Sequence, residues 1–140
     1  MLVCPTGWTG FQNHCYKLSD QKLMWNKARL HCKSMSSNLV SIHSRDEWNF
    51  IKNHIISQLR RSSNDIWTGG YKVDHTWAWE DGSTFGDWTY WEKTQPNGQK
   101  NQCMYLRGIH GFQWFDTNYK GLYEVKWGLC MKGKWNAAHY

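Results

Sequence analysis

Five cysteines, at positions 4, 15, 32, 103 and 130, constrain the fold of this 140-residue chain more than any other feature. None of them forms the Cys-x-x-Cys pair that is typical of a zinc site or of a thioredoxin-like redox site. Four of the five can form two disulfides, and that number in a small, aromatic-rich domain is typical of an oxidising compartment. The sequence therefore predicts a secreted, extracellular protein with two disulfides and one cysteine left over.

The length of the chain fits one domain with a sizeable core and is too short for two. No run of about 18 apolar residues is present, so we expect no membrane-spanning helix and no membrane insertion. Eleven Trp, seven Tyr and five Phe indicate an ordered interior, because disordered chains are poor in such residues. Residues 1–140 are accordingly expected to form a single domain.

The formal net charge of +6 is spread along the chain, apart from Arg60-Arg61 and a lysine-rich end at Lys126, Lys132 and Lys134. Net charge reports on solubility and non-specific attraction rather than on fold. A scattered pattern favours a solvated basic surface over a nucleic-acid footprint. We expect no nucleic-acid partner.

The first half of the chain carries two helical patterns. The first starts at a cap formed by Ser19 or Asp20 and ends near Lys33, with apolar residues spaced three and four apart. Residues 38–42 alternate like a short strand. Ser44 and Glu47 form a capping box. It begins a second helix whose predicted inward face consists of Phe50, Ile51, Ile55 and Leu59.

The second half has the character of β-structure. Strands are predicted at residues 66–70, 76–79, 102–106, 111–115 and 125–131. Between the second and third of these lies a stretch from Gly82 to Asn101 with little periodicity. Long loops in compact domains are usually functional or disordered, and the aromatics Trp88, Tyr90 and Trp91 favour an ordered one.

Several landmarks follow one another in a fixed order. They include Cys4-Pro5-Thr6-Gly7-Trp8, Trp67-Thr68-Gly69-Gly70, Trp77-Ala78-Trp79-Glu80-Asp81-Gly82, Gln95-Pro96-Asn97 and Trp114-Phe115-Asp116. Over essentially its whole length the chain resembles the C-type lectin-like domain family, in the long form with an extra N-terminal disulfide. Within this family it resembles secreted invertebrate-type lectins with a Gln-Pro-Asn motif and a degenerate calcium site. The resemblance implies an α+β fold, with two helices flanking small antiparallel sheets and a long ordered loop region.

By the same resemblance Cys4 pairs with Cys15 and Cys32 pairs with Cys130. The family's partner for Cys103 would stand at position 119, where this chain has Tyr119. Cys103 is then either a buried free thiol, the interpretation that we favour, or the source of an interchain disulfide in a homodimer.

The resemblance also implies a sugar site in which Gln95 and Asn97 flank a cis Pro96, and the family's calcium-ligand positions map onto Gln95, Asn97, Asn101, Phe115 and Asp116. Taken alone, residues 96–98 would also make a good turn. Calcium needs about six to eight oxygen ligands, several of them charged. Asn101 stands where the family usually has Glu, and Phe115 where it usually has Asn. We therefore expect no cofactor, with calcium bound weakly at most.

Sugar binding can survive the loss of calcium. The amides of Gln95, Asn97 and Asn101 both donate and accept, Asp116 accepts strongly, and Phe115 could serve as an apolar platform. This set suits neutral or N-acetylated hexoses, similar to GlcNAc, GalNAc or galactose. The predicted function is a multivalent agglutinin or innate-immune pattern recogniser that binds glycans on cell or microbial surfaces.

The alternative is a protein-binding domain, such as a receptor or venom-type subunit, with a vestigial sugar site. We expect no enzyme and no catalytic residues. Glu80, Asp81 and Glu92 are not placed as the carboxylate pair of a glycosidase, and no nucleophile motif is present.

Overall fold

The computed structural model describes residues 1–60, 63–98, 101–118 and 124–137, so that Arg61 and Tyr119 lie outside the described residues. The helical segments are α1 (Trp25–Ser34), α2 (Arg45–Phe50), the π-helical turn η1 (Ile51–Ile55) and the 3₁₀ turns η2 (Ile56–Gln58) and η3 (Gly108–His110). The strands are β1 (Leu2–Val3), β2 (Thr9–Phe11), β3 (His14–Leu23), β4 (Asn38–Leu39), β5 (Asp65–Val73), β6 (Thr76–Trp79), β7 (Gln102–Arg107), β8 (Gln113–Asn118), β9 (Lys126–Gly133) and β10 (Trp135–Asn136).

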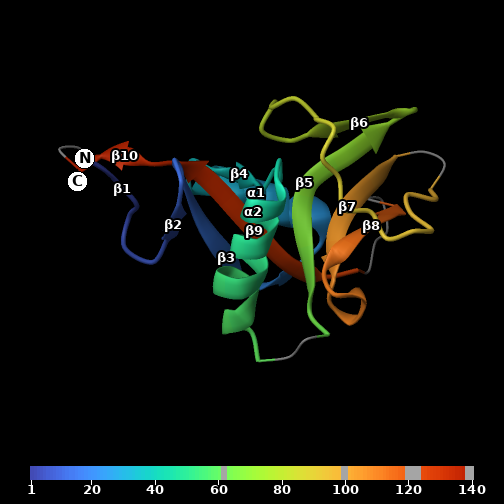
Figure 1. The fold of residues 1–140 in the computed structure, drawn as a ribbon, viewed down its shortest axis with the longest axis horizontal. Coiled ribbons are helices and arrows are strands. Elements are labelled where there is room, and N and C mark those ends of the chain that lie inside the picture. Colours follow the sequence, from blue (N-terminus) through green and yellow to red (C-terminus); the bar gives the residue numbers. More distant parts are fainter. Residues whose placement is uncertain (61–62, 99–100, 119–123, 138–140) are drawn as a thin grey trace.

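One sheet of eight strands forms the body of the molecule. Its main path runs β2-β3-β9-β5-β7-β8, with β4 added to β9 and β6 added to β5. Most neighbours are antiparallel, while β5 and β9 pair in parallel, with Ile66 opposite Trp127. β1 and β10 form a separate small sheet near the two termini (Figure 1). The predicted α+β fold is confirmed, although the main sheet is mixed rather than purely antiparallel.

The first helix begins later than the sequence predicted. Residues 14–23 form β3, which pairs along β9, and the helix starts at Trp25 with Met24 as its N-cap residue. Ser19 cannot cap the helix because its hydroxyl accepts from the amide of Gly128 at 2.9 Å and donates to the carbonyl of Gln21. Sheet pairing therefore overrides the helical pattern in this segment. The predicted buried spacing of Trp25, Ala28 and Cys32 is confirmed.

The second helix begins with half of the predicted capping box. The Ser44 hydroxyl accepts from the amide of Glu47 at 3.1 Å. The Glu47 carboxylate does not reach back to Ser44; it accepts from the His43 amide at 2.8 Å and from the Tyr16 hydroxyl at 2.5 Å. Burial, and then the charge of Glu47, raise the pKa of Tyr16. This buried bond joins β3 to α2.

The apolar core lies on both faces of the sheet. One cluster includes Ile51, Ile55, Met104 and Trp114, and the other includes Trp25, Trp67, Tyr105 and Phe115. Of the four residues predicted to face inward from the second helix, Phe50, Ile51 and Ile55 are buried, while Leu59 is partly buried against the first cluster.

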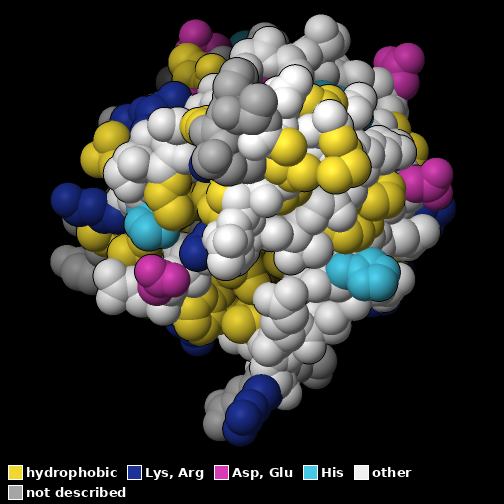
Figure 2. All heavy atoms as spheres, turned by 90° about the vertical axis from the view of Figure 1, so that its left-hand side faces the viewer, with side chains coloured by type: hydrophobic (Ala, Val, Ile, Leu, Met, Phe, Trp, Pro, Cys, Tyr) yellow, Lys and Arg dark blue, Asp and Glu magenta, His cyan; other side chains and the backbone are white. Residues whose placement is uncertain are grey.

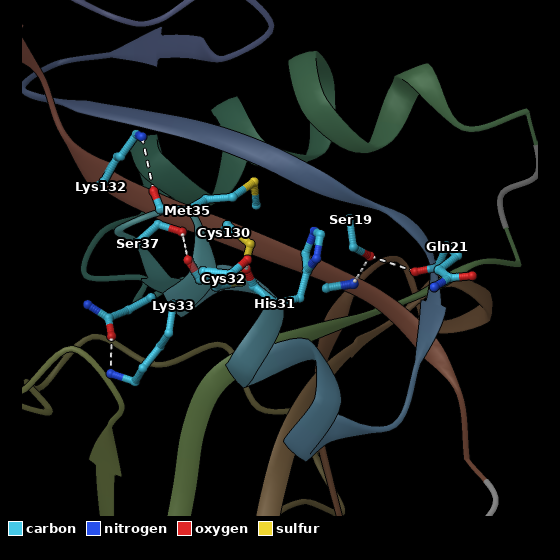
Figure 3. The surroundings of a disulfide bond; sticks show 12 residues. Ser19, Gln21, His31, Cys32, Lys33, Met35, Ser37, Cys130 and Lys132 are labelled. Atoms are coloured by element: carbon cyan, nitrogen blue, oxygen red, sulfur yellow. Dashed lines mark hydrogen bonds between the residues drawn. A yellow bond between two sulfur atoms is a disulfide. The ribbon is translucent and has the colours of Figure 1, made fainter.

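The two disulfides implied by the resemblance are both present, Cys4–Cys15 and Cys32–Cys130. The second joins α1 to β9 (Figure 3). Around it, the Ser37 hydroxyl donates to the carbonyl of Cys32 at 2.6 Å, and the Lys132 ammonium donates to the carbonyl of Met35 at 3.1 Å. These bonds hold the C-terminal end of α1 against the sheet.

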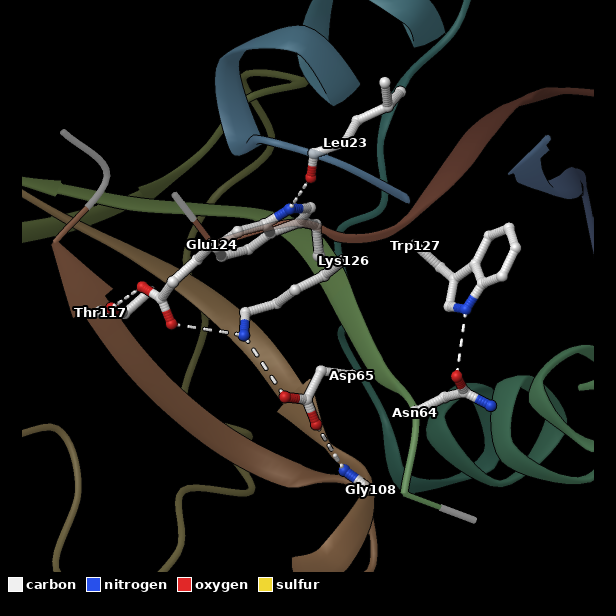
Figure 4. A network of polar contacts seen from close by, with 9 residues as sticks. Leu23, Asn64, Asp65, Gly108, Thr117, Glu124, Lys126 and Trp127 are labelled. Atoms are coloured by element: carbon white, nitrogen blue, oxygen red, sulfur yellow. Dashed lines mark hydrogen bonds and ion pairs between the residues drawn. The ribbon is translucent and has the colours of Figure 1, made fainter. Parts of the chain in front are cut away.

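Lys126 is not the solvated surface charge that the sequence suggested. It is 7% exposed, and its ammonium contacts the carboxylates of Asp65 at 3.3 Å and Glu124 at 3.4 Å (Figure 4). The same ammonium lies 4.1 Å from the centre of the Tyr105 ring. A buried cation needs such partners, so Lys126 joins β9 to the start of β5.

Cys103 lies in the second core cluster with its side chain 0% exposed and carries no disulfide. Burial, and then the charge of Glu124, raise the pKa of its thiol. Because thiol reagents attack the exposed thiolate, we expect no reaction with Ellman's reagent in the native protein and reaction of one thiol after denaturation. A dimer band on a non-reducing gel that disappears on reduction would contradict this assignment.

Candidate functional site

The long loop that starts at Gly82 is anchored on Trp114 of β8. Trp114 is 0% exposed, and the rings of Trp79, Trp88 and Trp91 meet it edge-on with centroids 5.7, 5.5 and 5.6 Å away. The Trp114 amide donates to the carbonyl of Tyr90 at 2.9 Å, and its carbonyl accepts from the amide of Glu92 at 3.1 Å. The loop is thus joined to β8 by an isolated parallel bridge between Trp91 and Trp114, which fixes the position of the residues that follow.

A hydrogen-bonded frame holds the end of the loop. The Gln95–Pro96 peptide is cis. The Asp116 carboxylate accepts from the amides of Asn97 at 3.3 Å and Gly98 at 2.9 Å. In return, the Asp116 amide donates to the side-chain oxygen of Gln95 at 3.1 Å. Asp116 is 8% exposed, and its bonds to the loop are partly buried. The structure therefore brings Gln95, Asn97 and Asp116 together.

Lys72 of β5 also binds this frame, and the sequence did not predict its role. Its side chain is buried, and its ammonium donates to the carbonyl of Gly98 at 2.6 Å. Gly98 packs closely on Gln102, since a Cβ at this position would lie 2.2 Å from the Gln102 side-chain carbon. Gly98 is therefore held at its amide by Asp116 and at its carbonyl by Lys72. The available signal was a lysine within a strand whose neighbours are almost all apolar.

The exposed groups of the site are amides. Asn97 is exposed, and Gln95 and Asn101 are half-buried. Asn101 has a left-handed backbone, with φ of 47°. Among the described contacts no hydrogen bond joins Asn101 to Gln95, Asn97 or Asp116. The structure thus leaves Asn101 outside the frame.

Phe115 does not form the apolar platform that the sequence suggested. Successive residues of a strand point to opposite faces of the sheet, and Asp116 faces the loop. The Phe115 ring consequently lies in the second core cluster, 5% exposed, 5.9 Å from the Tyr105 ring and 4.9 Å from the Arg107 guanidinium. This part of the predicted site is corrected.

A carboxylate lies at the edge of the frame. Glu92 accepts from the amide and hydroxyl of Thr94, and its carbonyl accepts from the Gln95 amide at 2.8 Å. The hydroxyl bond from Thr94 is the main reason why the pKa of Glu92 is lowered. The loop therefore presents one ionised acceptor close to the amides.

The donor set does not fit a calcium ion. Calcium needs several free oxygen ligands, yet both oxygens of Asp116 and the oxygen of Gln95 already accept backbone amides. The buried ammonium of Lys72 brings a competing positive charge to the same loop. Within the described ranges, no group of three or more His, Cys, Asp or Glu side chains could hold a metal.

A second polar cluster contains Ser41, His43, Asp81 and Ser83, the residue types of a hydrolase site. Both serine hydroxyls donate to Asp81, at 2.5 Å each, and the His43 ring nitrogen lies 3.0 Å from each hydroxyl. Burial opposes ionisation of Asp81, but the bonds from Ser41 and Ser83 outweigh it and lower its pKa. The carboxylate binds the hydroxyls rather than orienting the histidine, so the cluster does not form a nucleophile–base–carboxylate chain.

Comparison with known proteins shows that this chain is similar to proteins with a C-type lectin domain. The family model described as Lectin C-type domain matches residues 21–125. Ladderlectin of Oncorhynchus mykiss is 34% identical over 119 residues, which cover 82% of this chain and 62% of that protein. Galactose-specific lectin nattectin of Thalassophryne nattereri is 32% identical over 122 residues, covering 86% of this chain and 70% of that protein.

The solved structure of a calcium-independent type II antifreeze protein superposes with a TM-score of 0.82 at 28% identity, covering 96% of this chain and 98% of that one. The chain spans less than two thirds of the length of the first curated relatives that it matches, 62% of ladderlectin and 8% of human C-type mannose receptor 2. Within the described part of this chain, no helix is long and apolar enough to cross a membrane.

Proposed function

We propose that this chain, which belongs to the C-type lectin domain family, is a carbohydrate-binding protein that recognises neutral or N-acetylated hexoses through its long loop. The name of nattectin, a galactose-specific lectin, supports a sugar of this class. GlcNAc, GalNAc and galactose are the candidates, because amide groups donate to and accept from neutral hydroxyl and acetamido groups. The proposed role is binding without catalysis.

The observation that carries this proposal is the hydrogen-bonded frame around Asp116. It fixes the backbone of Asn97 and the side chain of Gln95 before any ligand arrives. Groups that are already ordered lose less entropy on binding, so a preorganised pair of amides binds better than a mobile one. In this proposal Asp116 positions the loop, and the side chains of Gln95, Asn97 and Asn101 contact the sugar.

We propose further that binding needs no calcium. The acceptors that would coordinate the ion instead hold the frame together, and the Lys72 ammonium supplies positive charge from within the chain. We also propose that the protein is secreted, which its two disulfides support. Its partners would be glycans on cell or microbial surfaces, bound by several sites displayed together as in an agglutinin. A homodimer could supply such sites, but not through the buried Cys103.

A glycan array probed once with calcium and once with EDTA tests this function. We expect the same neutral or N-acetylated glycans to be bound under both conditions. Binding that EDTA abolishes would overturn calcium independence. No binding under either condition would favour the alternative of a protein partner.

Replacing the exposed Asn97 by alanine tests the site itself. The change removes a side-chain amide but keeps the backbone amide that Asp116 holds, so the fold should be unaffected. We expect the dissociation constant for the best glycan to rise at least about tenfold, the equivalent of one or two lost hydrogen bonds. Asn26→Ala on the exposed side of α1 is the matched control and should change affinity little. Equal affinity of the two variants would place the site elsewhere.

A further inference from the structure

A pocket of about 450 Å³ lies on another part of the molecule, between the β2–β3 turn and the helical segment α2–η1. The turn contributes Phe11 and Gln12, and the helical segment contributes the other side chains. In Figure 1, β2 (blue) lies towards the left end of the longest axis, whereas the long loop (yellow) lies at its centre and right. The left-hand side of the molecule in Figure 1 shows hydrophobic side chains between polar ones (Figure 2). The pocket is thus separate from the site proposed above.

One wall of this pocket is aromatic. The rings of Phe11 and Phe50 stack with centroids 4.6 Å apart and an angle of 18° between their planes. The His54 ring stacks on Phe50 at 5.4 Å and 26°. Aromatic faces carry partial negative charge, and the C–H groups on one side of a pyranose ring are weakly positive. Phe50 is 8% exposed, so the half-buried Phe11 and the exposed His54 supply the ring surface against which a sugar would bury its apolar side.

The rim of the pocket is polar and almost neutral. It consists of the amides of Gln12, Asn49 and Asn53 and the carboxylate of Asp46. Asp46, Asn49 and Asn53 are spaced three and four residues apart, so they lie on one side of the helical segment. Among the contacts of the described residues, none of these four side chains takes part in a hydrogen bond or ion pair. Their donors and acceptors are therefore available to a ligand.

Amides suit hydroxyl groups, because each amide both donates and accepts as a hydroxyl does. A single carboxylate adds a strong acceptor and disfavours an anionic ligand. The volume lies in the range typical of small-molecule pockets and is large enough for a mono- or disaccharide. From this combination of aromatic wall, amide rim and size, we propose that the pocket is a second carbohydrate site, for neutral pyranosides.

The second site does not depend on the long-loop site, and either can exist without the other. If both bind, one chain has two sugar sites on different faces, so that a monomer can cross-link glycans. Linked sites raise the strength of attachment well above that of each alone. Agglutination would then need no dimer.

Titration of the ¹⁵N-labelled protein with the methyl glycosides of GlcNAc and galactose, up to tens of millimolar, tests the site. We expect saturable shifts of the Asn49 and Asn53 side-chain NH₂ signals and of the Gln12 amide. The variant Asn49→Ala/Asn53→Ala should weaken this binding at least about tenfold. Asn13→Ala, an exposed asparagine of the same turn outside the pocket, is the matched control and should leave it unchanged.

Asn97→Ala separates the two sites. Pocket shifts that persist in Asn97→Ala and are lost in Asn49→Ala/Asn53→Ala would support the second site, whatever happens at the long loop. Shifts confined to the long loop would overturn the second site and leave the proposed function standing. The absence of pocket shifts with both glycosides would overturn the second site as well.

Discussion

Replacing Cys32 and Cys130 together by alanine should lower the free energy of unfolding by about 4–5 kcal/mol. The bond closes a loop of 98 residues, so that removing it greatly enlarges the number of conformations open to the unfolded chain. Small domains are stable by only about 5–15 kcal/mol. We therefore expect a protein that unfolds at much lower urea concentration or does not accumulate in folded form. Urea unfolding followed by tryptophan fluorescence measures the change.

The other disulfide provides the matched control. Cys4 and Cys15 are 11 residues apart, and the same chain-entropy relation gives about 3 kcal/mol for their loss. This bond holds the N-terminal segment to β3, whereas Cys32 and Cys130 lie in the second core cluster. A larger loss of stability in Cys4→Ala/Cys15→Ala than in Cys32→Ala/Cys130→Ala would contradict the argument from loop length.

The fold was predictable wherever short-range patterns and sheet pairing agree. Trp25, Ala28 and Cys32 mark a buried helical face, and Ser44 marks a helix start, because both signals arise within one or two turns. The segment from Ser19 to Leu23 shows the limit. Its polar residues suit a helix start, but pairing with β9 more than a hundred residues away makes it a strand. Such a contact has no signature in the local sequence.

The sequence predicted that Gln95, Asn97 and Asp116 lie close together but not how they contact one another. Gln95, Asn97 and Asp116 lie together, but the oxygens of Gln95 and Asp116 point inward to backbone amides. Phe115 was assigned by its position in a motif, and strand alternation turns it to the opposite face. The role of Lys72 was not predicted because a lysine in a strand is normally solvated. Only the folded structure shows that its ammonium donates to the carbonyl of Gly98.

Asp116→Ala should have the largest effect of any single change in the hydrogen-bonded frame that holds the long loop. It leaves the part-buried backbone amides of Asn97 and Gly98 without their acceptor, and it removes the residue that holds the amide of Gly98 while Lys72 holds its carbonyl. A hydrogen bond to a charged group contributes about 1.5–3 kcal/mol, and because these bonds are only partly buried we expect a total loss of stability of about 2–3 kcal/mol. Glycan binding through the loop should fall at least about a hundredfold as Gln95 and Asn97 lose their fixed positions. Asp87→Ala, an exposed aspartate of the same loop, is the control and should be near neutral.

A double-mutant cycle that combines Asp116→Ala with Lys72→Met tests whether the two residues stabilise the loop cooperatively. Lys72 binds the carbonyl of Gly98 and Asp116 binds its amide. The contribution of each residue to stability should therefore depend on the presence of the other. Coupled neighbours show interaction energies of about 0.5–3 kcal/mol. The double variant should accordingly be less destabilised than the sum of the two single variants by an amount in this range. Strictly additive losses would mean that the two residues act independently and that the Lys72 ammonium does not support the position that Asp116 gives to Gly98.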